Sequence, residues 1–116
     1  MDPHFDGVIF KTHPAELYRR IQVEYPPFVV IDVRTPDKRS GSRIIGSIGI
    51  SASNLAEGLP EGSTVSTEFF VVGRDHYDEE VRRASESLRD LGARRVVELA
   101  GGMCEWHAEH MPVEVA

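Results

Sequence analysis

Two short, uninterrupted apolar runs constrain the fold of this chain more than any other feature of its sequence. They are Phe28 to Ile31 and Phe69 to Val72, and both are rich in branched and aromatic side chains. Such runs are typical of strands buried on both faces, as in a parallel sheet covered by helices. Val96 to Leu99 predicts a third strand, and Gly7 to Phe10 and Ile48 to Ile50 predict two shorter ones.

Segments with a helical pattern alternate with these strands. A helix is expected to start at Pro14, another over the apolar face that begins at Val81 and stops at Gly92, and a last short one from Met103 to His110. Thr35-Pro36 opens a short turn or helix, and residues 51–68 are expected to be the least ordered part of the chain. The alternation predicts an α/β fold with a five-stranded, mostly parallel sheet and helices on both faces.

Length and charge narrow the classes of function. The 116 residues are expected to form one domain, 1–116, and the formal net charge of −6 disfavours nucleic acid and anionic membranes as partners. Cys104 is the single cysteine, which excludes an intramolecular disulfide. Met1 to Asp6 lacks the pattern of a signal peptide, so a cytoplasmic location is expected. We expect no cofactor, and the partner is an unidentified protein or small ligand.

Three loops are the places where a ligand site is expected. In open α/β sheets the site lies beyond the carboxyl ends of the strands. The loops after Ile31, Val72 and Leu99 therefore carry the candidate residues.

At these loops the sequence resembles the rhodanese (thiosulfate sulfurtransferase) family. The resemblance is carried by Val30 to Pro36, which contains Asp-Val-Arg, and by the closing segment Val96 to Met103 with Trp106 and Met111 to Val113. Arg43 to Ile48 matches a middle motif in part, because Arg43 and Ile45 stand where the family has His and Pro. The resemblance implies the fold predicted above.

The resemblance also implies that the catalytic loop has lost its chemistry. Active members carry a cysteine after the fourth main strand, whose thiolate becomes a persulfide stabilised by backbone N–H groups. The corresponding run here is Gly73-Arg74-Asp75-His76-Tyr77-Asp78. Gly73 stands at the nucleophile's position, and Asp78 stands where an anion-pairing arginine is usual. We expect Asp78 or Glu79 to cap the following helix, so that a carboxylate takes the place of a bound anion.

Four residues are expected to support this loop. Asp32 and Arg34 are expected to be structural, because a buried charge at the sheet edge needs a partner. The Gly101-Gly102 turn is expected to neighbour the Gly73 loop, because parallel strands end on one side.

Metal-ligand side chains occur at Asp75 and His76 and at the pair His107 and His110, but no metal site is expected from them.

Two hypotheses follow for function. The first is a catalytically inactive rhodanese-like domain that acts as a binding or regulatory module. The alternative is a sulfurtransferase that uses Cys104 as a relocated thiol to transfer sulfane sulfur from thiosulfate or a persulfide.

Overall fold

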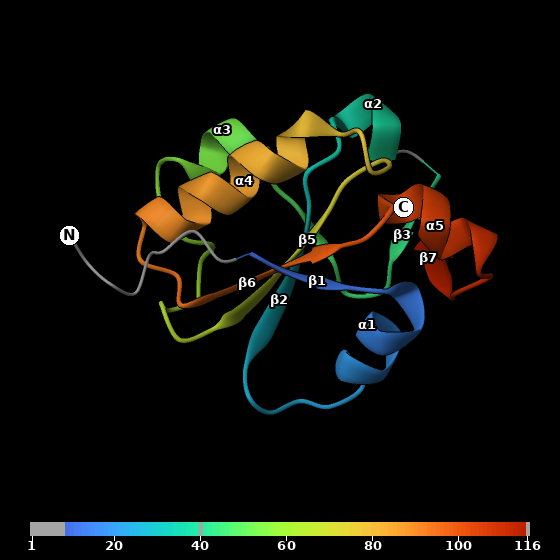
Figure 1. Cartoon of the computed structure of the whole chain (residues 1–116), viewed down its shortest axis with the longest axis horizontal. Helices are drawn as coiled ribbons and strands as arrows, with labels where there is room; N and C mark the ends of the chain where they lie inside the picture. The colour runs from blue at the N-terminus through green and yellow to red at the C-terminus, as the bar shows by residue number, and fades with distance from the viewer. Residues whose placement is uncertain (1–8, 40, 116) are drawn as a thin grey trace.

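A five-stranded parallel sheet forms the centre of the molecule. The computed structural model describes residues 9–39 and 41–115. The strand order is β1-β6-β5-β2-β4, and all four pairings are parallel. Figure 1 views the sheet with β1 toward the viewer. The strands are β1 (Phe10–Thr12), β2 (Phe28–Asp32), β4 (Ile48–Gly49), β5 (Glu68–Val72) and β6 (Arg95–Leu99). The predicted fold class is confirmed.

The three strands predicted as central, β2, β5 and β6, occupy the middle of the sheet. Their side chains point alternately to two apolar layers. Phe69 and Val71 pack with Leu88 on one face, whereas Phe70 and Val72 pack with Trp106 on the other. Burial on both faces explains why these segments read as continuous apolar runs.

Helices cover both faces of the sheet (Figure 1). On one face lie α3 (Ala52–Leu55) and α4 (Glu79–Asp90), and on the other lie α1 (Pro14–Arg20) and α5 (Gly102–Ala108). The short helix α2 (Pro36–Arg39) follows β2. The helix expected from Pro14 is confirmed, and so is the end of α4 before Gly92, which has a φ of +97°.

Some local expectations were wrong. The antiparallel pair β3 (Ser42–Ile44) and β7 (Val113–Val115) was not predicted, because each strand is three residues long and is defined by its distant partner. The segment 51–68 contains α3, which is capped by Ser51. The last helix spans Gly102–Ala108 rather than Met103 to His110.

The first strand also differs from its expected range. It begins at Phe10 and runs to Thr12, where it pairs with β6. Gly7 and Val8, like the segment Met1 to Asp6, lie outside the described residues.

The order of the strands determines where a site forms. From β2 the chain adds β4 on one side and β5 on the other. The loops that leave β2 and β5 therefore diverge at a topological switch point, which is the usual position of a ligand crevice in such sheets.

Candidate functional site

The loop that follows β5 is closed by the carboxylate of Asp78. Oδ2 of Asp78 accepts a hydrogen bond from the main-chain N–H of Arg74 (2.8 Å), and Oδ1 accepts one from Glu80 (3.1 Å). Asp78 is thus the N-cap of α4, where a carboxylate is favoured by both hydrogen bonding and the helix dipole. The prediction that Asp78 or Glu79 caps this helix is confirmed for Asp78.

Gly73 is buried beneath this cap. A β-carbon at position 73 would lie 2.4 Å from Cγ2 of Val81 and 2.9 Å from Oδ2 of Asp78. Both distances are shorter than ordinary van der Waals contact. The space that a side chain at position 73 would need is therefore filled by the first turn of α4.

Asp75 holds the outer part of the loop. Its Oδ1 accepts a hydrogen bond from the N–H of Tyr77 (2.9 Å), and its Oδ2 lies 3.2 Å from Nε of Arg74. Burial alone would raise the pKa of Asp75, but the Tyr77 N–H and the Arg74 guanidinium hold that pKa below its usual value. The rings of His76 and Tyr77 lie 3.8 Å apart, and Tyr77 is 76% exposed.

The Gly101-Gly102 turn packs directly against the loop, as expected. The main-chain nitrogen of Met103 donates to the carbonyl of Gly73 (2.9 Å), and that of Cys104 donates to the carbonyl of Arg74 (2.9 Å). A β-carbon on Gly102 would lie 2.5 Å from the Gly73 carbonyl oxygen. Only glycine permits this approach of the two backbones.

Cys104 reaches the loop through its backbone. Its side chain, on the first turn of α5, is exposed. The structure thus brings the residue beside Arg74.

Asp32 and Arg34 form a buried ion pair on the neighbouring side of the switch point. Nη2 of Arg34 lies 2.8 Å from Oδ2 of Asp32, and the two side chains are 7% and 1% exposed. Arg34 also donates to the carbonyls of Lys38 (3.0 Å) and Ser42 (2.9 Å). The pair therefore ties the end of β2 to α2 and β3.

A small cavity of about 170 Å³ opens between the loops that leave β2 and β5. Arg34, Thr35 and Lys38 line it from the β2 side, and Arg74, Asp78 and Glu80 line it from the β5 side. Sequence reasoning did not single out Thr35 and Lys38 as site residues, because only the fold brings them opposite Arg74 and Asp78. Basic and acidic side chains both line this cavity.

His107 and His110, the two histidines near the end of α5, lie in different environments. Nε2 of His107 lies 3.3 Å from Oγ of Ser42, and His110 follows the end of α5 with a φ of +58°. Within residues 9–39 and 41–115, no group of three or more His, Cys, Asp or Glu side chains is arranged to hold a metal ion. Over the same residues, no helix is long and apolar enough to cross a bilayer.

The fold and the position of this loop define an α/β domain with its candidate site at the carboxyl edge of a parallel sheet. The chain belongs to the rhodanese-like domain family, whose model matches residues 13–109. No curated protein matches the chain in sequence.

Solved structures agree with this assignment. A protein of Bacillus halodurans superimposes with a TM-score of 0.80 at 24% identity, over 91% of this chain and 77% of that one. The rhodanese-like domain of a protein from Anabaena sp. gives 0.77 at 25% identity, over 100% and 81%. A rhodanese-related protein of Thermoplasma volcanium gives 0.73 at 27% identity, over 92% and 99%.

Proposed function

We propose that this chain, taken as one domain over residues 1–116, is a rhodanese-like domain that binds a partner or ligand without catalysing sulfur transfer. In this proposal Gly73 stands where active members of the family carry the nucleophilic cysteine. The observation that carries the proposal is the collision that a β-carbon at Gly73 would make with Val81 and Asp78. The loop lacks a thiol, and it also lacks the room for one.

The hydrogen-bond donors of the loop support the same conclusion. A persulfide anion in an active site needs free backbone N–H groups around it. Here the N–H groups of Arg74 and Glu80 already donate to the Asp78 carboxylate. Asp75 and Glu79 add negative charge nearby, which disfavours an anionic donor such as thiosulfate.

One observation favours the alternative, a sulfurtransferase that uses Cys104. The main-chain nitrogen of Cys104 is bonded to the Arg74 carbonyl, so this exposed cysteine sits beside the loop. In this alternative, the Cys104 thiol would accept sulfane sulfur at a position outside the loop, without stabilisation by the loop's N–H groups.

A thiosulfate-to-cyanide assay separates the two functions. The protein and its Cys104→Ser variant are incubated with thiosulfate and cyanide, and thiocyanate is measured against a protein-free blank. The proposed binding function predicts no thiocyanate above the blank for either protein. Activity that the Cys104→Ser variant loses would establish the sulfurtransferase instead.

A further inference from the structure

Glu98 is a partly buried charged residue on a strand whose neighbouring positions Val96, Val97 and Leu99 are buried and apolar. It lies on the central strand β6 and faces α4, and its side chain is only 13% exposed. Central strands of parallel sheets are normally apolar at such positions, because burying a carboxylate is costly unless it is paired. The sheet therefore maintains a carboxylate where packing alone would favour Val or Ile.

Two donors hold this carboxylate in place. Oγ of Ser85, a residue of α4 that is 1% exposed, donates to Oε2 of Glu98 (2.7 Å). Nζ of Lys11, on the edge strand β1, lies 3.2 Å from Oε1. A carboxylate offers about four lone-pair positions, so both oxygens retain the capacity to accept a further donor.

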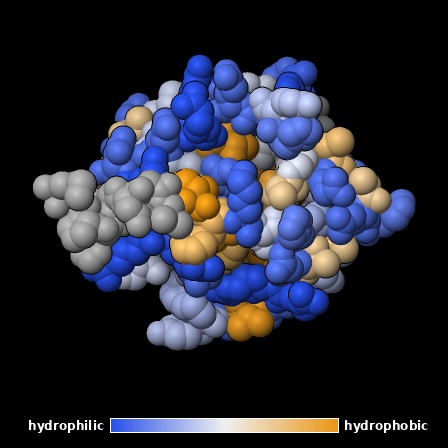
Figure 2. Space-filling model, in the orientation of Figure 1, coloured by the Kyte–Doolittle hydropathy of each residue, from blue (hydrophilic) through white to orange (hydrophobic). Residues whose placement is uncertain are grey.

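Glu98 lines a cavity of about 410 Å³ between the β1 edge and α4. This volume lies within the range of small-molecule sites. Ile9, Val81 and Leu99 give the cavity apolar walls. Figure 2 views this edge and shows apolar surface between the positions of α4 and β1, with hydrophilic side chains around it.

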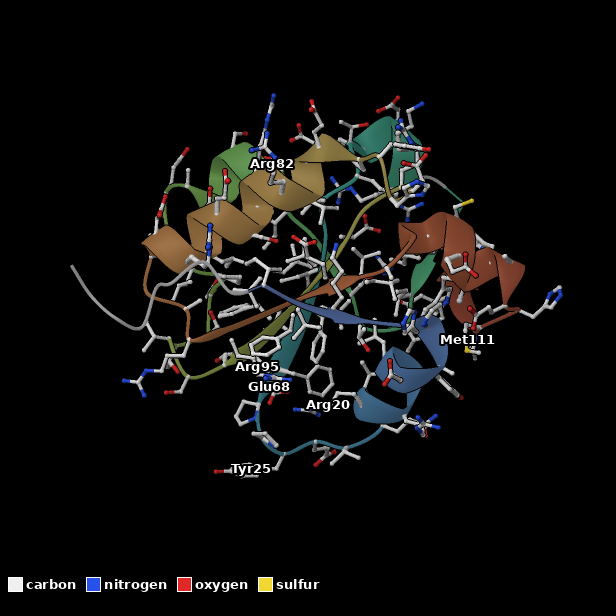
Figure 3. The ribbon with its side chains drawn as sticks, viewed as in Figure 1. Arg20, Tyr25, Glu68, Arg82, Arg95 and Met111 are labelled. Carbon is white, nitrogen blue, oxygen red and sulfur yellow. The ribbon has the colours of Figure 1, made fainter. Side chains whose placement is uncertain are left out.

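The charges around the cavity favour a cation. Three carboxylates, those of Asp75, Asp78 and Glu98, line it, against Lys11, Arg82 and the imidazole of His76. Arg82 lies on α4 above β1 in Figure 3 and pairs with Glu86 at 3.6 Å, which lies outside the cavity lining. Lys11 already places an alkylammonium group on Glu98, and at 68% exposure that group is free to leave.

We propose that this cavity binds a small cationic ligand that carries an ammonium or guanidinium group on an aliphatic body. Glu98 is the counter-ion, Ser85 is the positioning residue that orients it, and Lys11 is an internal ammonium that the ligand displaces. The apolar walls contact the aliphatic body. This inference rests on the proposed function only in that the domain binds rather than reacts.

The test uses n-butylammonium chloride as the probe and the full chain labelled with ¹⁵N. Titration followed by amide chemical shifts is expected to move Lys11, Val81 and Glu98 saturably, whereas butyrate and 1-butanol are expected to leave them unchanged. Glu98→Gln is expected to weaken binding by tenfold or more, because a charge-assisted hydrogen bond is lost. Glu24→Gln, at an exposed carboxylate in the segment after α1 that does not line this cavity, is the matched control and is expected to bind like the wild type.

Lys11→Met provides a second test that does not depend on whether Glu98→Gln folds. This substitution lies at an exposed side chain and is expected to tighten n-butylammonium binding several-fold, because the internal ammonium is gone. Absence of saturable shifts in both the wild type and Lys11→Met would overturn the inference, as would equal binding of butyrate. Thiocyanate production, measured separately, would contradict the proposed function and leave these titrations unaffected.

Discussion

Oδ2 of Asp78 lies 2.8 Å from the main-chain nitrogen of Arg74, so the loop after β5 carries its own anion. The same carboxylate caps α4 through Glu80 and borders the space above Gly73. One side chain thereby starts the helix, accepts a hydrogen bond from the loop N–H of Arg74 and excludes a side chain at position 73. Under the proposed function, this one arrangement both stabilises α4 and leaves the loop without an anion site.

Loss of the Asp78 cap is expected to lower stability. Asp78→Ala removes both hydrogen bonds, and the free energy of unfolding should fall by about 1 kcal/mol, the usual contribution of an N-cap. Asp78→Asn keeps an acceptor oxygen and should lose less. Urea unfolding of the three proteins measures the difference, and equal stability of Asp78→Ala and the wild type would contradict the role of the cap.

A thiol at position 73 is not expected to create an enzyme. Gly73→Cys places a β-carbon 2.4 Å from Val81, so the variant should lose about 1–3 kcal/mol of stability through overpacking. Its thiolate would also face Asp75 and Asp78, which repel thiosulfate. Gly73→Ala is the control that shares the overpacking and lacks the thiol. Robust thiocyanate production by Gly73→Cys would show that the acidic loop does not block the reaction.

The buried pair of Asp32 and Arg34 is expected to matter far more than an exposed pair. Arg34→Met leaves the Asp32 carboxylate buried without its counter-ion, which should cost about 3–5 kcal/mol. Arg82→Met, which breaks the exposed pair with Glu86, should cost less than about 1 kcal/mol. Chemical denaturation of both variants compares them. Similar losses would mean that the buried pair does not anchor the end of β2.

The stability contributed by Asp75 is expected to depend on pH. Its pKa in the folded chain lies below the usual value, so its ionised form favours the folded state. This contribution is present above about pH 3.9, the reference pKa of Asp, and is lost as the pH falls below it. Asp75→Asn should therefore differ more from the wild type in unfolding free energy at pH 6 than at pH 3. An equal difference at both pH values would contradict the shift.

The central strands could be predicted from sequence, but the antiparallel pair of β3 and β7 could not. Phe69 to Val72 is apolar at every position because both of its faces are buried, and that pattern is local. The pairing of β3 with β7 joins segments 71 residues apart through contacts such as Arg43 with Glu114 (2.9 Å). Three-residue strands carry too little periodicity to reveal such a pairing.

Some features of the candidate site could likewise be predicted from local sequence, and others depend on the fold. The cap by Asp78 was predictable, because a capping residue acts on its own helix within a few positions. The filling of the space above Gly73 by Val81 depends on how α4 is seated on the sheet, which no local pattern contains. The contact of Ser85 with Glu98 likewise joins a helix to a strand. The only sequence signal for this contact is the charged residue Glu98 inside the predicted strand Val96 to Leu99.

The most direct test of the closed loop is a sulfate titration of the ¹⁵N-labelled wild type, followed at the amides of Arg74 and Glu80 at constant ionic strength. Because both N–H groups already donate to Asp78, we expect no saturable shift in the wild type and tighter sulfate binding in Asp78→Ala. Saturable shifts of these two amides in the wild type, or a sulfate held by them in a crystal, would contradict it.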